Sequence, residues 1–155
     1  MAPVLYVLIG VQGAGKSTWA AANAARLKAE VVASDAIRNE LESAGRPAEG
    51  RGDEVFAVLV ERVAAGLAAG RNVIADATHV RRAWRQATLA VAQAQHARRV
   101  AVWFDLPLEV SLARNAQRPG GSWGHRRVEA GEIRQLWRET EPPGADEFDE
   151  IVIVR

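Results

Sequence analysis

The sequence predicts an α/β fold in which a five-stranded parallel sheet lies between two layers of helices. Two observations support this prediction. Short apolar runs alternate along the chain with longer segments of helical periodicity. Most of these runs are apolar throughout, which is typical of parallel strands that helices cover on both faces. The predicted strands span residues 4–9, 31–33, 72–75, 99–104 and 150–154.

Six helices are predicted between the strands, and several carry recognisable boundary residues. The third has apolar residues at helical spacing, with Asp53 placed to cap its start and Gly70 placed to end it. Pro107 stands in the first turn of the fifth helix, where an N–H group would have no helical partner. The predicted helices span residues 16–28, 35–43, 54–69, 80–95, 107–117 and 129–140.

The composition suits a single domain, residues 1–155, with its own hydrophobic core. The chain has 155 residues, 48% of them hydrophobic, and no long linker interrupts it. It has no Cys, so disulfides and thiolate metal sites are excluded and a cytoplasmic location is expected. No apolar run approaches the roughly 20 residues that cross a bilayer, so we expect no membrane association. A net charge of +1 limits any nucleic-acid contact to a local basic patch.

A glycine-rich stretch, GVQGAGKST, directly follows the first predicted strand and leads into the first predicted helix. It satisfies the pattern G-x-x-x-x-G-K-[ST], in which backbone N–H groups and a helix N-terminus bind phosphate. Lys16 is expected to reach the β and γ phosphates of ATP, and Ser17 to ligate Mg²⁺. The sequence therefore predicts a P-loop NTPase. The predicted nucleotide contacts in this stretch are Gly10, Gly13, Ala14, Gly15, Lys16, Ser17 and Thr18.

Polar residues follow the second predicted strand, at the sheet edge where ligands of open parallel sheets bind. Asp35 could orient the hydroxyl group of a phosphoryl acceptor and accept its proton. Arg38 stands three residues on, so a helix would place it on the same side as Asp35. It could hold a phosphate of the acceptor or steady the carboxylate. The alternative is that Ser34 or Asp35 only caps the short helix.

The third predicted strand ends in a second polar turn. Asp76 is predicted to lie in the Mg²⁺ shell, directly or through water, with capping of the next helix by Asp76 or Thr78 as the alternative. His79 is expected at the surface or in a pocket rather than as a catalyst. We predict that Thr78, His79 and Arg82 contact the acceptor. The three arginines in 81–85 form either a solvated helix face or the path of an anionic acceptor.

The segment at about 114–130 is predicted to form a helical lid that carries arginines and closes over the phosphates. Between residues 110 and 128 there is no acidic side chain, and a Pro-Gly-Gly sequence interrupts the basic run. Arg114 and Arg118 are predicted to bind the ATP phosphates, and Arg118 to act at the transferring group while the lid excludes water. A basic surface loop is the alternative. The acidic segment that follows, 129–150, is expected to face solvent.

Together these positions resemble the P-loop kinase family that includes the polynucleotide 5′-hydroxyl kinases. The resemblance spans nearly the whole chain, and its S-D-x-x-R and R-N-x-x-R motifs are much narrower than the phosphate loop alone. The motifs read GVQGAGKS, Ser34-Asp35-x-x-Arg38, Asp76-Ala77-Thr78-His79, Arg114-Asn115-x-x-Arg118 and Glu147-Phe148-Asp149. The resemblance implies that Lys16 and Ser17 bind ATP and Mg²⁺ and that Asp35 is the general base. It also implies that Arg38 binds the acceptor's phosphate and that Arg118 contacts ATP from the lid.

Three features depart from the family pattern and bear on the acceptor. His79 replaces an Asn, Glu129 stands where Pro is frequent, and glycines with Trp123 lengthen the lid. The first hypothesis is transfer to the 5′-hydroxyl end of DNA or RNA, with Trp103, Trp123 or Trp137 available to stack a base. The second is transfer to a small hydroxylated metabolite, such as a sugar, a nucleotide-sugar or an antibiotic. A non-catalytic nucleotide-binding module is the third, and the chain lacks the Asn-Lys-x-Asp run of GTPases.

Overall fold

The computed structural model describes residues 2–155, and every predicted strand and helix is present in it. The observed bounds differ from the predicted ones by no more than two residues. The strands are β1 (Val4–Ile9), β2 (Ala29–Ala33), β3 (Asn72–Asp76), β4 (Arg98–Phe104) and β5 (Glu150–Val154). The helices are α1 (Lys16–Leu27), α2 (Ser34–Ser43), α3 (Gly52–Ala68), α4 (Arg82–Ala94), α5 (Leu108–Ala116) and α6 (Ala130–Arg138).

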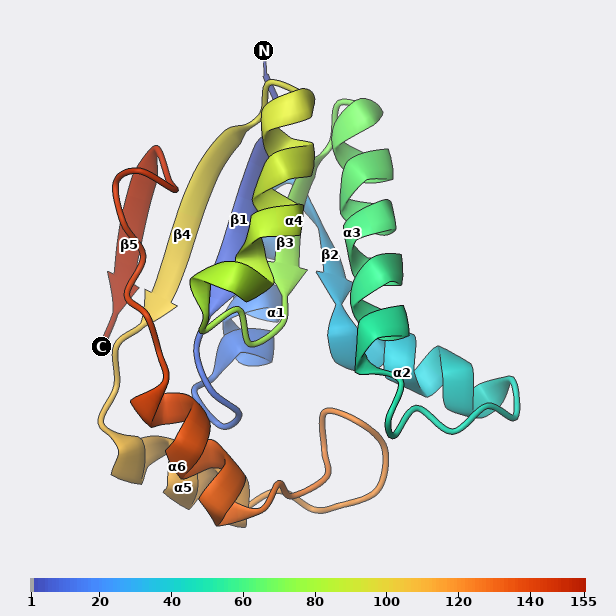
Figure 1. Cartoon of the computed structure of the whole chain (residues 1–155), viewed down its shortest axis with the longest axis vertical. Coiled ribbons are helices and arrows are strands. Elements are labelled where there is room, and N and C mark those ends of the chain that lie inside the picture. The colour runs from blue at the N-terminus through green and yellow to red at the C-terminus, as the bar shows by residue number, and fades with distance from the viewer. Residues whose placement is uncertain (1) are drawn as a thin grey trace.

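The strands form one parallel sheet in the order β2-β3-β1-β4-β5, which confirms the predicted fold class. In Figure 1, α3 and α4 lie in front of the sheet and α1 lies behind it, so the sheet is covered on both faces. Below the sheet, α5 and α6 lie side by side, and α2 lies beneath β2. The carboxyl ends of all five strands point toward this lower edge, where the predicted site residues are.

The central strand β1 sends side chains into both layers of the core. Val7 and Ile9 pack in the cluster that contains α3 residues such as Leu59. Leu8 packs in the second cluster, with Ala20 of α1. Because β1 is buried on both faces, its residues are apolar without alternation. This explains the continuous apolar run that precedes the phosphate loop.

Two predicted helix boundaries have different outcomes. Asp53 does not cap α3, because the helix begins at Gly52, one residue before Asp53. No side chain of the described residues caps this helix. Gly70 ends the helix as predicted, because it adopts a φ of +79° and its N–H group donates to Leu67 O at 2.9 Å. Within residues 2–155, no helix has both the length and the apolar composition needed to cross a bilayer.

Arg85 is completely buried, which corrects the expectation that the arginines of α4 face solvent or an acceptor. Its Nε and Nη2 atoms donate to the two carboxylate oxygens of Glu147, at 2.7 and 2.8 Å. Nη1 donates to His79 O at 2.9 Å, and Nη2 also donates to Glu141 O at 3.0 Å. Glu147 is likewise buried, so the acidic segment 129–150 does not face solvent throughout. One guanidinium thus joins α4, the turn after β3 and the segment before β5.

His79 is also completely buried, so the expectation that it lies at the surface or in an acceptor pocket is wrong. Its Nδ1 atom lies 3.1 Å from Leu8 O, and its ring packs edge-on against Phe56. The residue adopts a φ of +47°, and α4 starts three residues later, at Arg82. Burial lowers the pKa of His79 to about 4, so the ring is neutral at physiological pH.

We predict that breaking the buried Arg85–Glu147 pair destabilises the fold strongly. Either Arg85→Met or Glu147→Gln should lower the free energy of unfolding by about 3 kcal/mol or more, because one buried charge stays unpaired. Urea denaturation measures the effect. The exposed pair Arg98–Glu150, at 2.7 Å, provides the control, and Arg98→Met should change stability little. Similar losses in the two pairs would contradict the prediction.

We also predict that His79 makes the fold sensitive to acid. Below pH 6.5 the unfolded chain binds a proton that the folded chain does not bind until about pH 4, so stability falls as the pH drops. The loss should reach about 2 kcal/mol at pH 5, measured by urea denaturation at a series of pH values. His79→Asn should flatten this dependence, since Asn tolerates a positive φ. His96→Asn is the matched control, because His96 is exposed and has a φ of +54°.

Candidate active site

The phosphate loop connects β1 to α1 and takes its shape from two glycines. Gly13 and Gly15 adopt φ values of +83° and +99°, which L side chains rarely adopt. At Gly13 a Cβ atom would lie 2.3 Å from Ser111 O, because α5 packs directly on the loop. Gly15 is the N-cap of α1, and no side chain of residues 2–155 caps this helix. The loop therefore leaves a helix N-terminus available for phosphate, as the motif predicts.

Lys16, the first residue of α1, lies inside the loop. Its Nζ atom donates to Val11 O at 3.0 Å. Burial lowers the pKa of Lys16, whereas the carboxylates of Asp76 and Asp35 act in the opposite direction. Lys16, Asp76 and Asp35 all lie at or just beyond the carboxyl ends of neighbouring strands, so they lie at the same edge of the sheet.

Ser17 and Asp76 form the second contact between the loop and the sheet. Ser17 Oγ donates to Asp76 Oδ2 at 2.8 Å, and Asp76 is buried as the last residue of β3. Burial raises the pKa of Asp76, while Lys16 and the Ser17 hydrogen bond lower it. No cluster of three or more His, Cys, Asp or Glu side chains suited to a metal occurs in residues 2–155. One hydroxyl and one carboxylate fit Mg²⁺, which usually completes its shell with water and substrate phosphates.

Asp35 lies near these groups because β2 pairs with β3. Ala33, the last residue of β2, pairs with Asp76, and α2 starts at the next residue. Asp35 does not cap the helix; its Oδ1 atom instead accepts a hydrogen bond from Arg38 Nη1 at 3.0 Å. The side chains of Asp35 and Arg38 are 39% and 25% exposed, so both can be reached by a ligand. The capping alternative therefore does not explain Asp35.

The predicted lid at about 114–130 is mostly a loop between two helices, so the expectation of a helical lid is wrong. Residues 117–129 have no regular helix, whereas Arg114 lies on α5 and donates from Nη1 to Ala14 O of the phosphate loop at 2.9 Å. Asn115 closes the base of the loop, because its side-chain amide donates to Val128 O at 2.8 Å and accepts from Val128 N at 2.9 Å. Arg118 Nη1 donates to Arg126 O at 3.2 Å. Figure 1 shows this loop extending below the sheet toward α2.

The tip of the lid contacts α2, and the sequence did not predict this contact. Asn39 pairs with the backbone of Trp123, accepting from its N–H group at 2.9 Å and donating to its carbonyl at 3.1 Å. The guanidinium groups of Arg38 and Arg126 lie 5.2 and 3.8 Å from the centroid of the Trp123 ring. Residues 35, 38, 39 and 42 are polar and share one face of α2. Their helical spacing is the sequence pattern that could have indicated a polar contact on this face.

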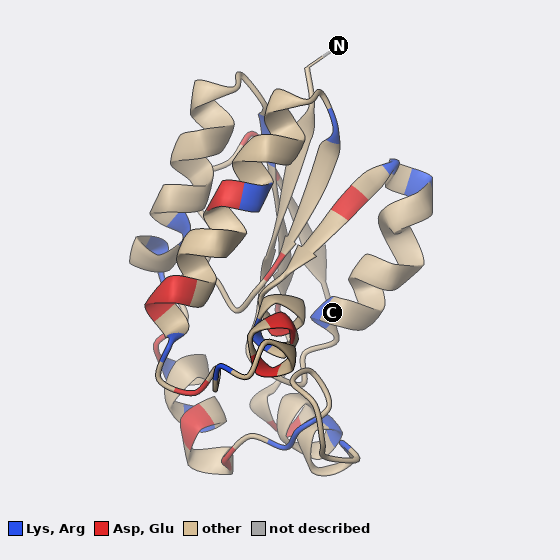
Figure 2. Ribbon diagram, turned by 90° about the vertical axis from the view of Figure 1, so that its right-hand side faces the viewer, with Lys and Arg blue, Asp and Glu red and all other residues tan. Residues whose placement is uncertain are grey.

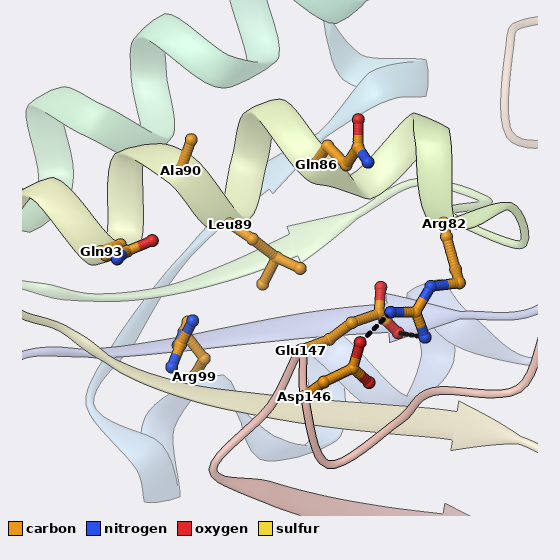
Figure 3. A pocket seen from close by; sticks show the side chains of 8 residues that line it. All are labelled: Arg82, Gln86, Leu89, Ala90, Gln93, Arg99, Asp146 and Glu147. Atoms are coloured by element: carbon orange, nitrogen blue, oxygen red, sulfur yellow. Dashed lines mark hydrogen bonds and ion pairs between the residues drawn. The ribbon is translucent and has the colours of Figure 1, made fainter.

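The other predicted acceptor contacts lie elsewhere. Thr78 accepts a hydrogen bond from Gly10 N at its backbone oxygen, at 3.1 Å, and thus connects its turn to the phosphate loop. Figure 3 shows Arg82 directed toward Asp146 and Glu147, with which it forms ion pairs. These three residues line a cavity of about 230 Å³ beside α4. Arg82 therefore faces the segment before β5, where two carboxylates neutralise its charge. His79, the other residue predicted to contact the acceptor, lies in the core.

The comparisons with known proteins agree with this architecture. A gluconokinase from Sinorhizobium meliloti superposes with a TM-score of 0.66 at 21% identity, covering 98% of this chain and 82% of that one. The Mycobacterium tuberculosis APS kinase, solved with AMPPNP and APS, gives 0.68 at 20% identity, covering 98% and 88%. A chain of the Pnkp1/Rnl/Hen1 RNA repair complex gives 0.71 at 24% identity, covering 89% of this chain and 44% of that one.

No curated protein sequence matches the chain significantly. The structural likenesses support the P-loop kinase-like fold. The sequence itself matches the AAA domain family model over residues 5–143, most of its length. The chain therefore belongs to this AAA domain family and has a kinase-like P-loop fold.

Proposed function

We propose that the chain is an ATP-dependent phosphotransferase that moves the γ-phosphate to a hydroxyl group, with the 5′-hydroxyl end of DNA or RNA as the first candidate acceptor. The observation that supports this proposal is the position of Asp35. It is an accessible carboxylate that follows the strand next to β3, pairs with Arg38 and does not cap its helix. A module that only binds a nucleotide would have no use for such a group.

Each residue of the site has a distinct role in this proposal. The phosphate loop and Lys16 bind and orient the donor phosphates, while Ser17 and Asp76 would hold Mg²⁺. ATP supplies the phosphoryl group and Mg²⁺ neutralises part of its charge. Asp35 orients the acceptor hydroxyl and accepts its proton, and Arg38 keeps that carboxylate in place. Arg114 and Arg118 add positive charge from the lid, so that positioning and charge neutralisation lower the barrier.

A nucleic-acid end is compatible with the charge of the chain. The net charge is only +1, and the acidic and basic positions are scattered over the molecule (Figure 2). An enzyme that binds one or two terminal nucleotides needs a local basic site rather than a long track. Arg38 on α2 and the lid arginines supply such a site. The chain similar in fold from the RNA repair complex is consistent with this candidate.

A small hydroxylated metabolite is the second candidate, and the lid tip favours it. A Cβ atom at Gly124 would lie 3.7 Å from Asp35 Oδ2, so the lid narrows the approach to the proposed base. A narrow approach suits a compact acceptor better than a polymer that continues beyond the site. The likeness to gluconokinase and APS kinase is consistent with this candidate.

An acceptor screen separates the two candidates. With ATP and Mg²⁺, we expect a 5′-hydroxyl oligonucleotide to become phosphorylated, detected by mass spectrometry. The parallel panel contains sugars, nucleotide-sugars and aminoglycoside antibiotics. If the oligonucleotide remains unmodified while a panel member gains a phosphoryl group, the nucleic-acid proposal is wrong and the metabolite proposal replaces it.

We predict that Asp35→Asn abolishes most of the transfer while ATP binding stays intact. Loss of the proton acceptor should slow transfer by about 10²-fold or more. The dissociation constant for ATP, measured by calorimetry, should stay within about 3-fold because the phosphate loop is unchanged. Asp53→Asn is the matched control, since Asp53 is an exposed carboxylate in the first turn of α3. Full activity of Asp35→Asn would exclude Asp35 as the base.

A further inference from the structure

The strand β5 forms one edge of the sheet and is mostly apolar. It is last in the strand order and pairs, among residues 2–155, only with β4. Figure 1 shows it at one side of the sheet. Its sequence is EIVIV, without proline, glycine or any charge after Glu150. Because the backbone groups of an edge strand lack partners on one side, an apolar strand of this kind can pair with a strand of another chain.

The outer edge of β5 carries the backbone groups of two isoleucines. Asp105 N donates to Val154 O at 2.9 Å, so Val154 directs its carbonyl group toward β4. Alternate residues of a strand bond to the same neighbour, so Val152 also faces β4. Ile151 and Ile153 therefore direct their N–H and C=O groups to the outside of the sheet. Each of them offers one donor and one acceptor to a partner strand.

The opposite edge of the sheet is protected by charge, whereas β5 is not. Glu30 lies within β2, the other edge strand, and pairs with Arg71 at 2.7 Å. A charged side chain inside an edge strand opposes pairing with another strand. β5 has no charge after its first residue, and the side chain of Ile153 is 45% exposed. Of the two edges, β5 is therefore the one suited to a partner.

The apolar surface at β5 extends toward α6. Ile153 pairs in register with Trp103 of β4, and Trp103 lines a cavity together with Trp137 of α6. Trp137 and Ile153 are two of the three large apolar side chains that are exposed in residues 2–155. Exposed apolar side chains that gather in one region favour an interaction surface there. A strand placed beside β5 would remove Ile153 from water, which is favourable.

A second copy of the chain complements this edge when its β5 strand runs antiparallel. A two-fold axis at Val152 places Ile151 of each copy opposite Ile153 of the other. The same register places Asp149 of each copy opposite Arg155 of the other. Opposite charges, like large apolar side chains, are favourable in directly opposed positions of a sheet. One surface therefore pairs with itself, as a two-fold interface requires.

Other registers lack this complementarity. An axis at Ile151 or at Ile153 would place a charged side chain opposite an isoleucine. An axis between two residues would oppose outward-facing and inward-facing backbone groups, so no ladder could form. In its own chain Asp149 contacts β4 through Oδ2, while the side chain of Arg155 is 72% exposed. Exposed ion pairs contribute little, so both charges remain available to the other copy.

We propose that β5 is a self-association surface, on which two copies of the chain pair antiparallel about Val152 and form one continuous sheet. Each opposed pair of isoleucines exchanges two backbone hydrogen bonds, and the Asp149–Arg155 pairs close both ends. A single strand edge buries less surface than a standard interface, so the dimer forms at micromolar rather than nanomolar concentration. Antiparallel pairing directs the carboxyl edges of the two sheets, and thus the two phosphate loops, to opposite ends of the dimer.

Sedimentation velocity tests the self-association without any nucleotide or acceptor, so its outcome is independent of phosphate transfer. Between about 1 and 300 µM, we expect the chain to pass from monomer to dimer. Ile153→Lys should raise the dissociation constant by about 10-fold or more, because it places a charge inside the new ladder. Val31→Lys is the matched control, since Val31 is a similarly exposed residue of β2, and it should leave the dimer unchanged. A chain that stays monomeric throughout, or equal effects of the two variants, would overturn the proposal.

Charge exchange tests the register. Asp149→Lys places two positive charges at each end of the dimer and Arg155→Asp places two negative ones, so each should weaken self-association by about 10-fold. An equimolar mixture of the two variants brings opposite charges together at both ends. Its dissociation constant should return to within about 3-fold of that of the unaltered chain, whereas a folding defect in either variant would persist in the mixture. Failure of the mixture to associate, or no effect of either variant alone, would rule out the antiparallel pairing.

Discussion

The parallel pairing of β2, β3 and β1 is the constraint on which the rest of the structure depends. Parallel strands end at the same edge of a sheet, so three segments far apart in the sequence deliver their polar residues to one place. The pairing of Ala33 with Asp76 puts the start of α2 beside the end of β3. The Ser17–Asp76 hydrogen bond then joins that edge to the phosphate loop. Without this register, Lys16, Asp76 and Asp35 would not lie at one edge of the sheet.

The two halves of the site are built by different means. Backbone geometry shapes the donor half: the positive φ values of Gly13 and Gly15 and the close approach of α5 leave little freedom there. Side chains shape the proposed acceptor half, through Asp35, Arg38 and the lid tip on α2. A binding site made of backbone groups suits a phosphate donor that is always the same. A binding surface made of side chains can change by substitution while the fold stays the same.

The sequence predicted the features that depend on local patterns. Apolar runs located the strands to within two residues, and the spacing of Gly10, Gly15 and Lys16 located the phosphate loop. The missed contacts join residues far apart in the chain. Arg85 and Glu147 looked like surface charges because nothing local reveals that the segment before β5 returns to cover α4. The pairing of Asn39 with Trp123 depends in the same way on where a long loop ends its path.

The two hydrogen bonds between Asn115 and Val128 have a consequence for how such a protein can diversify. Two hydrogen bonds fix the ends of the loop independently of what lies between them. Residues 117–127 can therefore be lengthened, shortened or replaced while α5 and its contact with the phosphate loop stay in place. The loop can be exchanged while the part of the fold that carries the phosphate loop stays the same. Recognition of a new acceptor could evolve, or be engineered, by altering one short stretch of chain and the facing stripe of α2.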